Sequence, residues 1–130
     1  MAQGIISLDT NYLIRTLIAG TSEADRVRLW IERGISLSCS SIVWYEFLCG
    51  PVGREEIEVM GSLLTAGIWP FGAKEAGTAS RLFNATGRKR HLRVDAMIAA
   101  TAIVQGSSFA TENKEDFRVF IPFELRLTEE

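Results

Sequence analysis

The chain has 130 residues, of which 47% are hydrophobic and 23% charged, the balance of a globular protein that can bury one core. Its formal net charge of −2 argues against binding nucleic acid through a uniformly basic surface, so such a contact must come from a local patch. Two cysteines and one histidine are too few for a disulfide framework or a structural zinc site.

The first predicted element is the strand Ile5–Leu8, which is followed at once by Asp9 and a helical pattern. An apolar run of this kind is typical of a central strand in a parallel sheet. Ligands bind at the carboxyl ends of the strands in open α/β sheets, so we expect Asp9 to point into that crevice.

The rest of the chain alternates helical and extended patterns, with glycine, proline and capping residues at most boundaries. In chain order we predict helices at 11–19 and 21–33, a strand at 35–39, helices at 42–49 and 54–65, a strand at 68–71, helices at 74–85 and 94–105, and a strand at 107–111. A turn at 113–117 and terminal strands at 119–122 and 124–127 complete the prediction. This alternation predicts an α/β protein with right-handed crossovers, a parallel sheet and helices on both faces.

Three later acids join Asp9 as candidate functional residues. Glu46 lies in the otherwise apolar helical segment SSIVWYEFLCG, where a lone carboxylate needs solvent or a partner. Asp95 opens RVDAMIAATAIV, whose small residues let that helix pack closely on the sheet. Asp116 lies in ATENKEDF, directly after a predicted strand.

Each acid also has an ordinary structural role open to it. Asp9 and Asp95 are suitable helix N-caps, a role worth about 1 kcal/mol. Glu46 fits a half-exposed helix position, and Asp116 with Asn113 fits a turn.

The combination of these acids favours a shared site. Two follow strands and two lie on helices predicted to pack beside those strands. Like charges about 4 Å apart repel by roughly 4 kcal/mol at an intermediate dielectric, so a fold that gathers four of them needs a cation. Oxygen ligands alone suit Mg²⁺ or Mn²⁺ rather than zinc.

The order of these motifs resembles the PIN domain, and within it the VapC-type toxins of bacterial and archaeal toxin–antitoxin pairs. The motifs are LDTNYL, an isolated Glu in an apolar helix, RVDAMIAATA and TENKEDF, and the last two together are specific. The resemblance covers the whole chain, and it implies a single domain over residues 1–130. The implied fold is a three-layer α/β/α arrangement with a central, mostly parallel sheet.

In that family the matching acids bind one or two divalent ions, and the enzyme cuts single-stranded or loop regions of RNA. The resemblance therefore implies catalytic and metal-binding roles for Asp9, Glu46, Asp95 and Asp116, with Mg²⁺ or Mn²⁺ as cofactor. It implies supporting polar roles for Thr10, Thr111 and Asn113. Glu112 stands where a basic or neutral residue is common, and its effect stays open.

The implied reaction is metal-assisted hydrolysis of a phosphodiester. A metal held mainly by Asp9 and Asp95 would lower the pKa of a bound water and neutralise charge in the transition state. Glu46 and Asp116 would hold a second ion or orient the water. The single histidine is not required by this scheme.

The segment GRKRHLR supplies positive charge just before Asp95, through Arg88, Lys89, Arg90 and Arg93. Phosphate contacts from such a segment would position an RNA strand without reading its sequence. A solvated surface loop is the alternative for this charge run.

The resemblance also implies partners and a cellular location. A small VapB-like antitoxin would present a basic side chain to the acidic pocket, and the toxin would form a homodimer. The N-terminal stretch MAQGIISLD lacks the basic region of a signal peptide, and the nearly apolar run 96–104 is too short to cross a bilayer. Together with cysteines expected to be reduced, this predicts a cytoplasmic protein without membrane contact.

Two other classes of function stay open. The first is a PIN nuclease in RNA processing or turnover with no dedicated antitoxin. The second is a non-enzymatic or phosphoacceptor α/β domain. Response-regulator receivers need paired acids, which Asp9 lacks, and haloacid-dehalogenase-like phosphatases need D-x-D-x-T, where Asn11 takes the second position.

Overall fold

The computed structural model describes residues 4–129 and contains a single parallel sheet. The strands are β1 (Ile5–Leu8), β2 (Ser36–Ser40), β3 (Gly67–Trp69) and β4 (Ser108–Ala110). Their order across the sheet is β3-β2-β1-β4, and each neighbouring pair is parallel. The central position of β1 was predicted from its apolar run and is confirmed.

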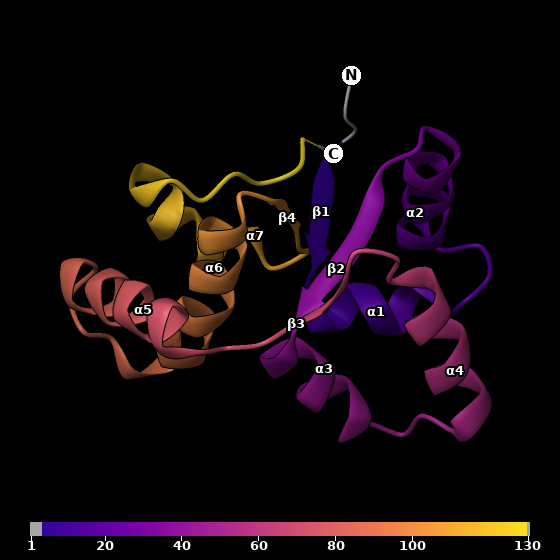
Figure 1. The fold of residues 1–130 in the computed structure, drawn as a ribbon, viewed down its shortest axis with the longest axis horizontal. Helices are drawn as coiled ribbons and strands as arrows, with labels where there is room; N and C mark the ends of the chain where they lie inside the picture. The colour runs from indigo at the N-terminus through magenta and orange to yellow at the C-terminus, as the bar shows by residue number, and fades with distance from the viewer. Residues whose placement is uncertain (1–3, 130) are drawn as a thin grey trace.

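Seven α-helices and two short 3-10 helices are found in the described residues. They are α1 (Thr10–Thr16), α2 (Ser22–Glu32), α3 (Ser41–Leu48), α4 (Arg54–Leu63), α5 (Ala73–Ala85), η1 (Arg90–Leu92), α6 (Arg93–Gln105), α7 (Lys114–Phe117) and η2 (Arg118–Phe123). Figure 1 shows α5, α6 and α7 on one side of the sheet and α1, α2 and α4 on the other. The predicted α/β/α layering around a parallel sheet is therefore confirmed.

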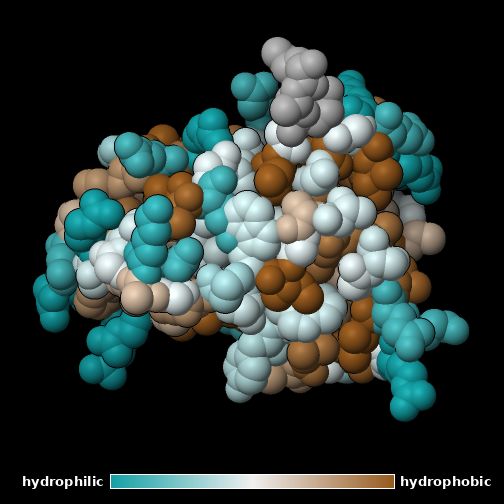
Figure 2. Space-filling model, in the orientation of Figure 1, coloured by the Kyte–Doolittle hydropathy of each residue, from teal (hydrophilic) through white to brown (hydrophobic). Residues whose placement is uncertain are grey.

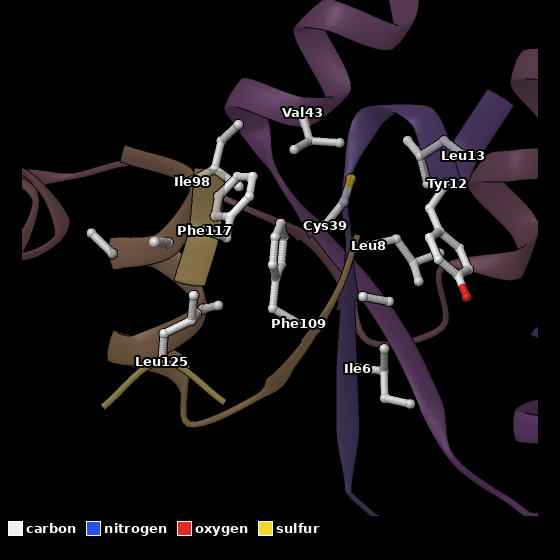
Figure 3. Close-up of a cluster of buried hydrophobic side chains, with 14 of the residues drawn as sticks. Ile6, Leu8, Tyr12, Leu13, Cys39, Val43, Ile98, Phe109, Phe117 and Leu125 are labelled. Atoms are coloured by element: carbon white, nitrogen blue, oxygen red, sulfur yellow. The ribbon is translucent and has the colours of Figure 1, made fainter. Parts of the chain in front are cut away.

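The core follows from the pattern of apolar residues in these elements. Leu8 and Phe109, from neighbouring strands, are fully buried, and Phe109 packs on Phe117 with ring centroids 4.7 Å apart (Figure 3). The alanines of α6, among them Ala99 and Ala100, are also fully buried. Because these side chains are small, α6 lies close to the sheet, as predicted.

The main errors of the sequence-based prediction lie in the C-terminal segment. Residues 119–122, predicted as a strand, belong to the 3-10 helix η2. Phe117 and Phe120 are three residues apart and both buried, a spacing that a 3-10 turn places on one face and an alternating strand does not. Of the predicted strand at 124–127, only an isolated bridge between Leu127 and Phe109 is present.

Smaller differences concern element boundaries. The helix predicted at 11–19 is α1, which ends at Thr16, and the strand predicted at 68–71 is β3, which ends before Pro70. The turn predicted at 113–117 contains the one-turn helix α7.

None of the helices within residues 4–129 has the length and apolar composition needed to span a membrane.

Candidate active site

The sheet register places two of the predicted site residues side by side. Leu8 of β1 lies beside Ala110 of β4, so the next residues, Asp9 and Thr111, meet at the carboxyl end of the sheet. The backbone N–H of Asp9 donates to the carbonyl of Ala110 at 3.0 Å, which continues the pairing past both strands. Two segments a hundred residues apart are therefore fixed next to each other by backbone hydrogen bonds.

Asp9 is the buried centre of the site, with 8% of its surface exposed. Its Oδ1 accepts a hydrogen bond from the backbone N–H of Thr10 at 2.8 Å, and its Oδ2 accepts one from Thr111 Oγ1 at 2.7 Å. Burial raises the pKa of Asp9 above its usual value, these two hydrogen bonds oppose the rise, and the charge of Glu46 adds to it. Asp9 is also the N-cap of α1, so the capping role and a place in the site coexist.

Glu46 comes from α3, which begins directly after β2. Ser40 caps this helix, because its Oγ accepts a hydrogen bond from the Val43 N–H at 3.1 Å. The Glu46 side chain is exposed, yet its Oε1 accepts a hydrogen bond from Thr10 Oγ1 at 2.6 Å. Thr10 therefore links the carboxylates of Asp9 and Glu46, one through its backbone and the other through its side chain.

Asp95 lies in the first turn of α6, whose N-cap is Leu92, so Asp95 is not the helix cap. Its pKa is raised to about 6 by burial and by the charges of Asp9, Asp116 and Glu46, and the His91 imidazole opposes this rise. Each of the three other acids is therefore close enough to Asp95 to affect its pKa.

Asp116 is held by the loop that follows β4. Its Oδ2 accepts a hydrogen bond from Asn113 Nδ2 at 3.0 Å. The backbone N–H of Asn113 in turn donates to Thr111 Oγ1 at 2.9 Å. Thr111 and Asn113 thus connect Asp116 to Asp9 through a chain of hydrogen bonds.

We call the four carboxylates Asp9, Glu46, Asp95 and Asp116 the acidic site. Their all-oxygen, negatively charged chemistry suits a hard divalent cation such as Mg²⁺ or Mn²⁺. Within residues 4–129, however, no group of three or more His, Cys, Asp or Glu side chains is arranged to hold a metal ion as it stands. The donor chemistry fits the cation, and the side chains would have to draw together around it.

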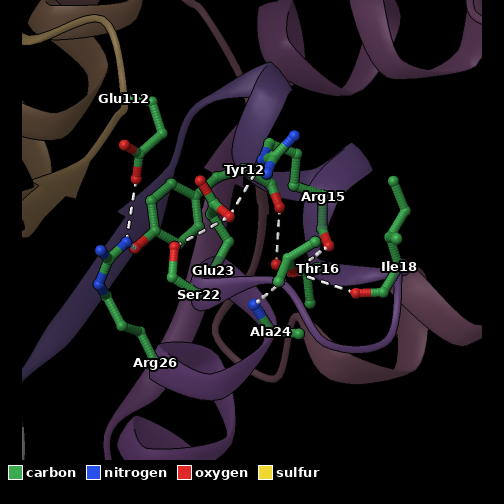
Figure 4. Close-up of polar contacts among 10 residues, drawn as sticks. Tyr12, Arg15, Thr16, Ile18, Ser22, Glu23, Ala24, Arg26 and Glu112 are labelled. Atoms are coloured by element: carbon green, nitrogen blue, oxygen red, sulfur yellow. Dashed lines mark hydrogen bonds and ion pairs between the residues drawn. The ribbon is translucent and has the colours of Figure 1, made fainter.

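Glu112 is a neighbour of this site whose surroundings could not be predicted from the sequence. Its Oε2 lies 3.0 Å from Arg26 NH1 of α2, and the same NH1 donates to the Tyr12 hydroxyl of α1 at 2.9 Å (Figure 4). The charge of Glu112 is therefore matched by Arg26. Arg26 and Glu112 are 86 residues apart, and no local motif marks such a pair.

A second ion pair, also drawn in Figure 4, joins α1 to α2. Arg15 Nε lies 3.0 Å from Glu23 Oε1, and the side chain of Glu23 is only 4% exposed. Burial opposes ionisation of Glu23, but hydrogen bonds from its own backbone N–H and from Arg15 outweigh it and lower its pKa. This ion pair joins α1 to α2.

The basic segment, residues 87–93, runs from the end of α5 into the start of α6. Its predicted RNA-contacting residues Arg88, Lys89, Arg90 and Arg93 are all exposed. His91 is close enough to Asp95 to lower its pKa, an interaction that the sequence alone does not predict. The structure thus brings the basic segment to the edge of the acidic site.

Comparisons with known proteins agree with this arrangement. The family model of the PIN domain matches residues 6–120. A search of curated proteins gave no match. Among solved structures, a chain of the VapBC2 complex from Rickettsia felis bound to a promoter DNA fragment has a TM-score of 0.74 at 20% identity, with 95% of this chain and 97% of that chain covered.

Two further solved structures share the fold. A chain of FitAcB from Neisseria gonorrhoeae has a TM-score of 0.69 at 21% identity, and 96% of each chain is covered. A chain of a toxin–antitoxin complex from Klebsiella pneumoniae has a TM-score of 0.66 at 24% identity, with 88% of this chain and 90% of that chain covered. With the family model matching most of its length, the chain belongs to the PIN-domain family, whose members are generally nucleases.

Proposed function

We propose that this protein is a divalent-metal-dependent endoribonuclease that acts as the toxin of a type II toxin–antitoxin pair. The observation that carries the proposal is the placement of four carboxylates, from the residue after β1 and from α3, α6 and α7. The charges of Asp9, Asp116 and Glu46 add to burial in raising the pKa of Asp95 to about 6. Such a concentration of negative charge is unfavourable unless a cation balances it. PIN-domain membership supports nuclease chemistry.

We assign Asp9 and Asp95 as the main ligands of Mg²⁺ or Mn²⁺, with Glu46 and Asp116 completing the site or orienting water. When bound, the ion would activate a water molecule and neutralise charge on the scissile phosphate. Thr10 and Thr111 hold the carboxylates of Glu46 and Asp9 by hydrogen bonds. This positioning restricts the carboxylates before the ion binds, which reduces the reorganisation that binding requires.

The basic segment supplies the proposed RNA contacts. Phosphates held there would place a neighbouring phosphodiester over the acidic site, since His91 and Asp95 already interact electrostatically. The acidic site alone repels a polyanion, so a nearby cationic surface is needed for the strand to approach.

The proposed protein partner is a VapB-like antitoxin, and we propose that the toxin forms a homodimer. The similar folds come from VapBC, FitAcB and toxin–antitoxin complexes, which supports a dedicated partner. Figure 2 shows hydrophobic surface on the side where α2 and α4 lie. The exposed apolar side chains of α2 and α4 include Leu29, Ile31 and Val59, and they offer a partner a surface to bury.

Cleavage of a single-stranded RNA tests the nuclease assignment. We expect wild-type protein to cut it with Mg²⁺ and to stop when EDTA is added. Asp9→Asn should lose cleavage while remaining folded, and the exposed α4 variant Glu55→Gln serves as a control that keeps it. Cleavage that survives both EDTA and Asp9→Asn would remove the proposal.

A further inference from the structure

A cavity of about 350 Å³ lies between the end of α5 and the start of α6. Its lining includes Ser80, Phe83, Asn84, Arg88, Arg93 and Met97. Arg93 and Met97 are four residues apart, so they share the face of α6 that turns toward α5. Asp95 lies on a different face of α6, and none of the four acids of the acidic site lines the cavity.

Two guanidinium groups from different elements converge on one aromatic ring in this cavity. The Cζ of Arg88 lies 5.5 Å from the ring centroid of Phe83, and the Cζ of Arg93 lies 5.4 Å from it. Arg88 NH1 also donates to Asn84 Oδ1. These contacts hold both guanidinium groups in place and leave further N–H groups for a ligand.

Within residues 4–129, neither Arg88 nor Arg93 forms an ion pair with an acid, whereas Arg15, Arg26 and Arg118 each do. Two preorganised guanidinium groups without carboxylate partners are a typical site for a phosphate group.

The backbone at Arg88 is unusual for a side-chain-bearing residue. Its φ is 56°, in the left-handed region, directly after Gly87 with φ 97°. The Arg88 N–H donates to the Phe83 carbonyl at 2.9 Å, which fixes this turn. Glycine or asparagine fits such a conformation with less strain, so an arginine here points to a use for its side chain.

We propose that this cavity, the Phe83 subsite, binds one nucleotide of the RNA substrate on one flank of the cleaved bond. The inference rests on the proposed nuclease function. Arg88 and Arg93 would hold a phosphate, the base would pack against Phe83 and Met97, and the Asn84 amide NH₂ would donate to it. An aromatic ring and an amide beside paired guanidinium groups match a nucleotide better than an acidic peptide.

Of the three arginines and one lysine of the basic segment, Arg88 and Arg93 line the Phe83 subsite, whereas Lys89 and Arg90 are exposed residues outside its lining. The contribution of the subsite to RNA affinity is measured by binding of a labelled single-stranded RNA to the full chain in EDTA, over a range of salt concentrations. Arg88→Ala with Arg93→Ala should weaken binding by at least about tenfold and lower the salt slope by about 0.7, the value for one lost phosphate contact on a single strand.

Two controls test the placement of the site. Arg81→Ala removes one positive charge from α5, the helix that carries Phe83, but Arg81 lines a separate cavity against Pro122, and we expect binding to change less than about threefold. Arg88→Gly relieves the positive-φ strain, so it should retain or gain thermal stability while losing as much RNA affinity as Arg88→Ala.

Cleavage kinetics distinguish failure of the subsite from failure of the nuclease function. In Mg²⁺, the double arginine variant should lose kcat/KM for a long RNA strand and retain it for the shortest RNA that the wild type cuts. If Arg81→Ala lost as much RNA affinity and kcat/KM as the double arginine variant, the effect would come from diffuse charge and the subsite would be overturned. The subsite would also be overturned if the double arginine variant weakened only binding to a partner protein. If the wild-type protein cuts no RNA at all, the result contradicts the proposed nuclease function, and the subsite with it.

Discussion

Thr111 Oγ1 donates a hydrogen bond of 2.7 Å to Asp9 Oδ2 and thereby ties the end of β4 to the end of β1. Thr111 is buried and also accepts from the Asn113 N–H. Thr111→Val keeps the side-chain shape and removes this donor. Because partners of metal ligands typically contribute about 10- to 100-fold, we expect RNA cleavage to fall by at least about tenfold.

The matched control is Thr111→Ser, which retains the hydroxyl and should keep most of the activity. Circular dichroism melting would verify that both variants fold. If Thr111→Val and Thr111→Ser cleave RNA equally well, the hydroxyl does not position Asp9.

The Arg26–Glu112 pair predicts two effects of different size on stability. The pair is partly exposed, so Glu112→Gln should cost about 1 kcal/mol or less in the free energy of unfolding. Arg26→Ala also removes the partner of the buried Tyr12 hydroxyl, so it should cost about 1–3 kcal/mol. Urea unfolding measures both, and equal costs would show that the Tyr12 contact contributes nothing.

Glu112 should also behave differently from the four acids in metal binding. Since Arg26 matches its charge, Glu112→Gln is expected to leave the affinity for Mn²⁺ within about twofold of wild type. Titration of Mn²⁺ against both proteins checks this. A large loss of affinity would place Glu112 among the ligands instead.

The raised pKa of Asp95 predicts how metal-free stability changes with pH. Its folded-state pKa of about 6 lies above the usual value of 3.8 for an aspartate, so the folded protein binds the proton more tightly than the unfolded chain does. Asp95 therefore destabilises the fold above pH 6, and this destabilisation disappears as the pH falls through about 6 toward 4. Relative to Asp95→Asn, wild-type protein in EDTA should gain stability between pH 7.5 and pH 5.

Thermal unfolding of both proteins over that range measures the effect. Glu23 acts in the opposite sense, because its pKa is lowered and its stabilising contribution is lost only as the pH falls below 4.5, the usual pKa of a glutamate. That loss is common to both proteins and cancels in the comparison. Parallel stability curves for wild type and Asp95→Asn would contradict the raised pKa.

The sequence allowed prediction of those parts of the fold that local patterns determine. The apolar run before Asp9 and the alanines after Asp95 indicated a central strand and a closely packed helix, and both are confirmed. The carboxyl-end rule for parallel sheets then placed Asp9 at the edge of the sheet. Its neighbour there, Thr111, is known from the strand register of the structure.

The remaining features depend on tertiary contacts. The Arg26–Glu112 pair and the approach of Arg88 and Arg93 to the Phe83 ring leave no periodic signal. Residues 119–122 form a short apolar run that a strand could also have, whereas packing of Phe120 in the core selects a 3-10 helix.

Binding of Mn²⁺ followed by electron paramagnetic resonance tests most directly whether the four acids share one cation site. We predict saturable binding by wild-type protein that weakens by at least about tenfold in each of Asp9→Asn, Glu46→Gln, Asp95→Asn and Asp116→Asn, and that is unchanged in Glu55→Gln. Binding that is indifferent to these four substitutions, or equally sensitive to Glu55→Gln, would contradict a shared site.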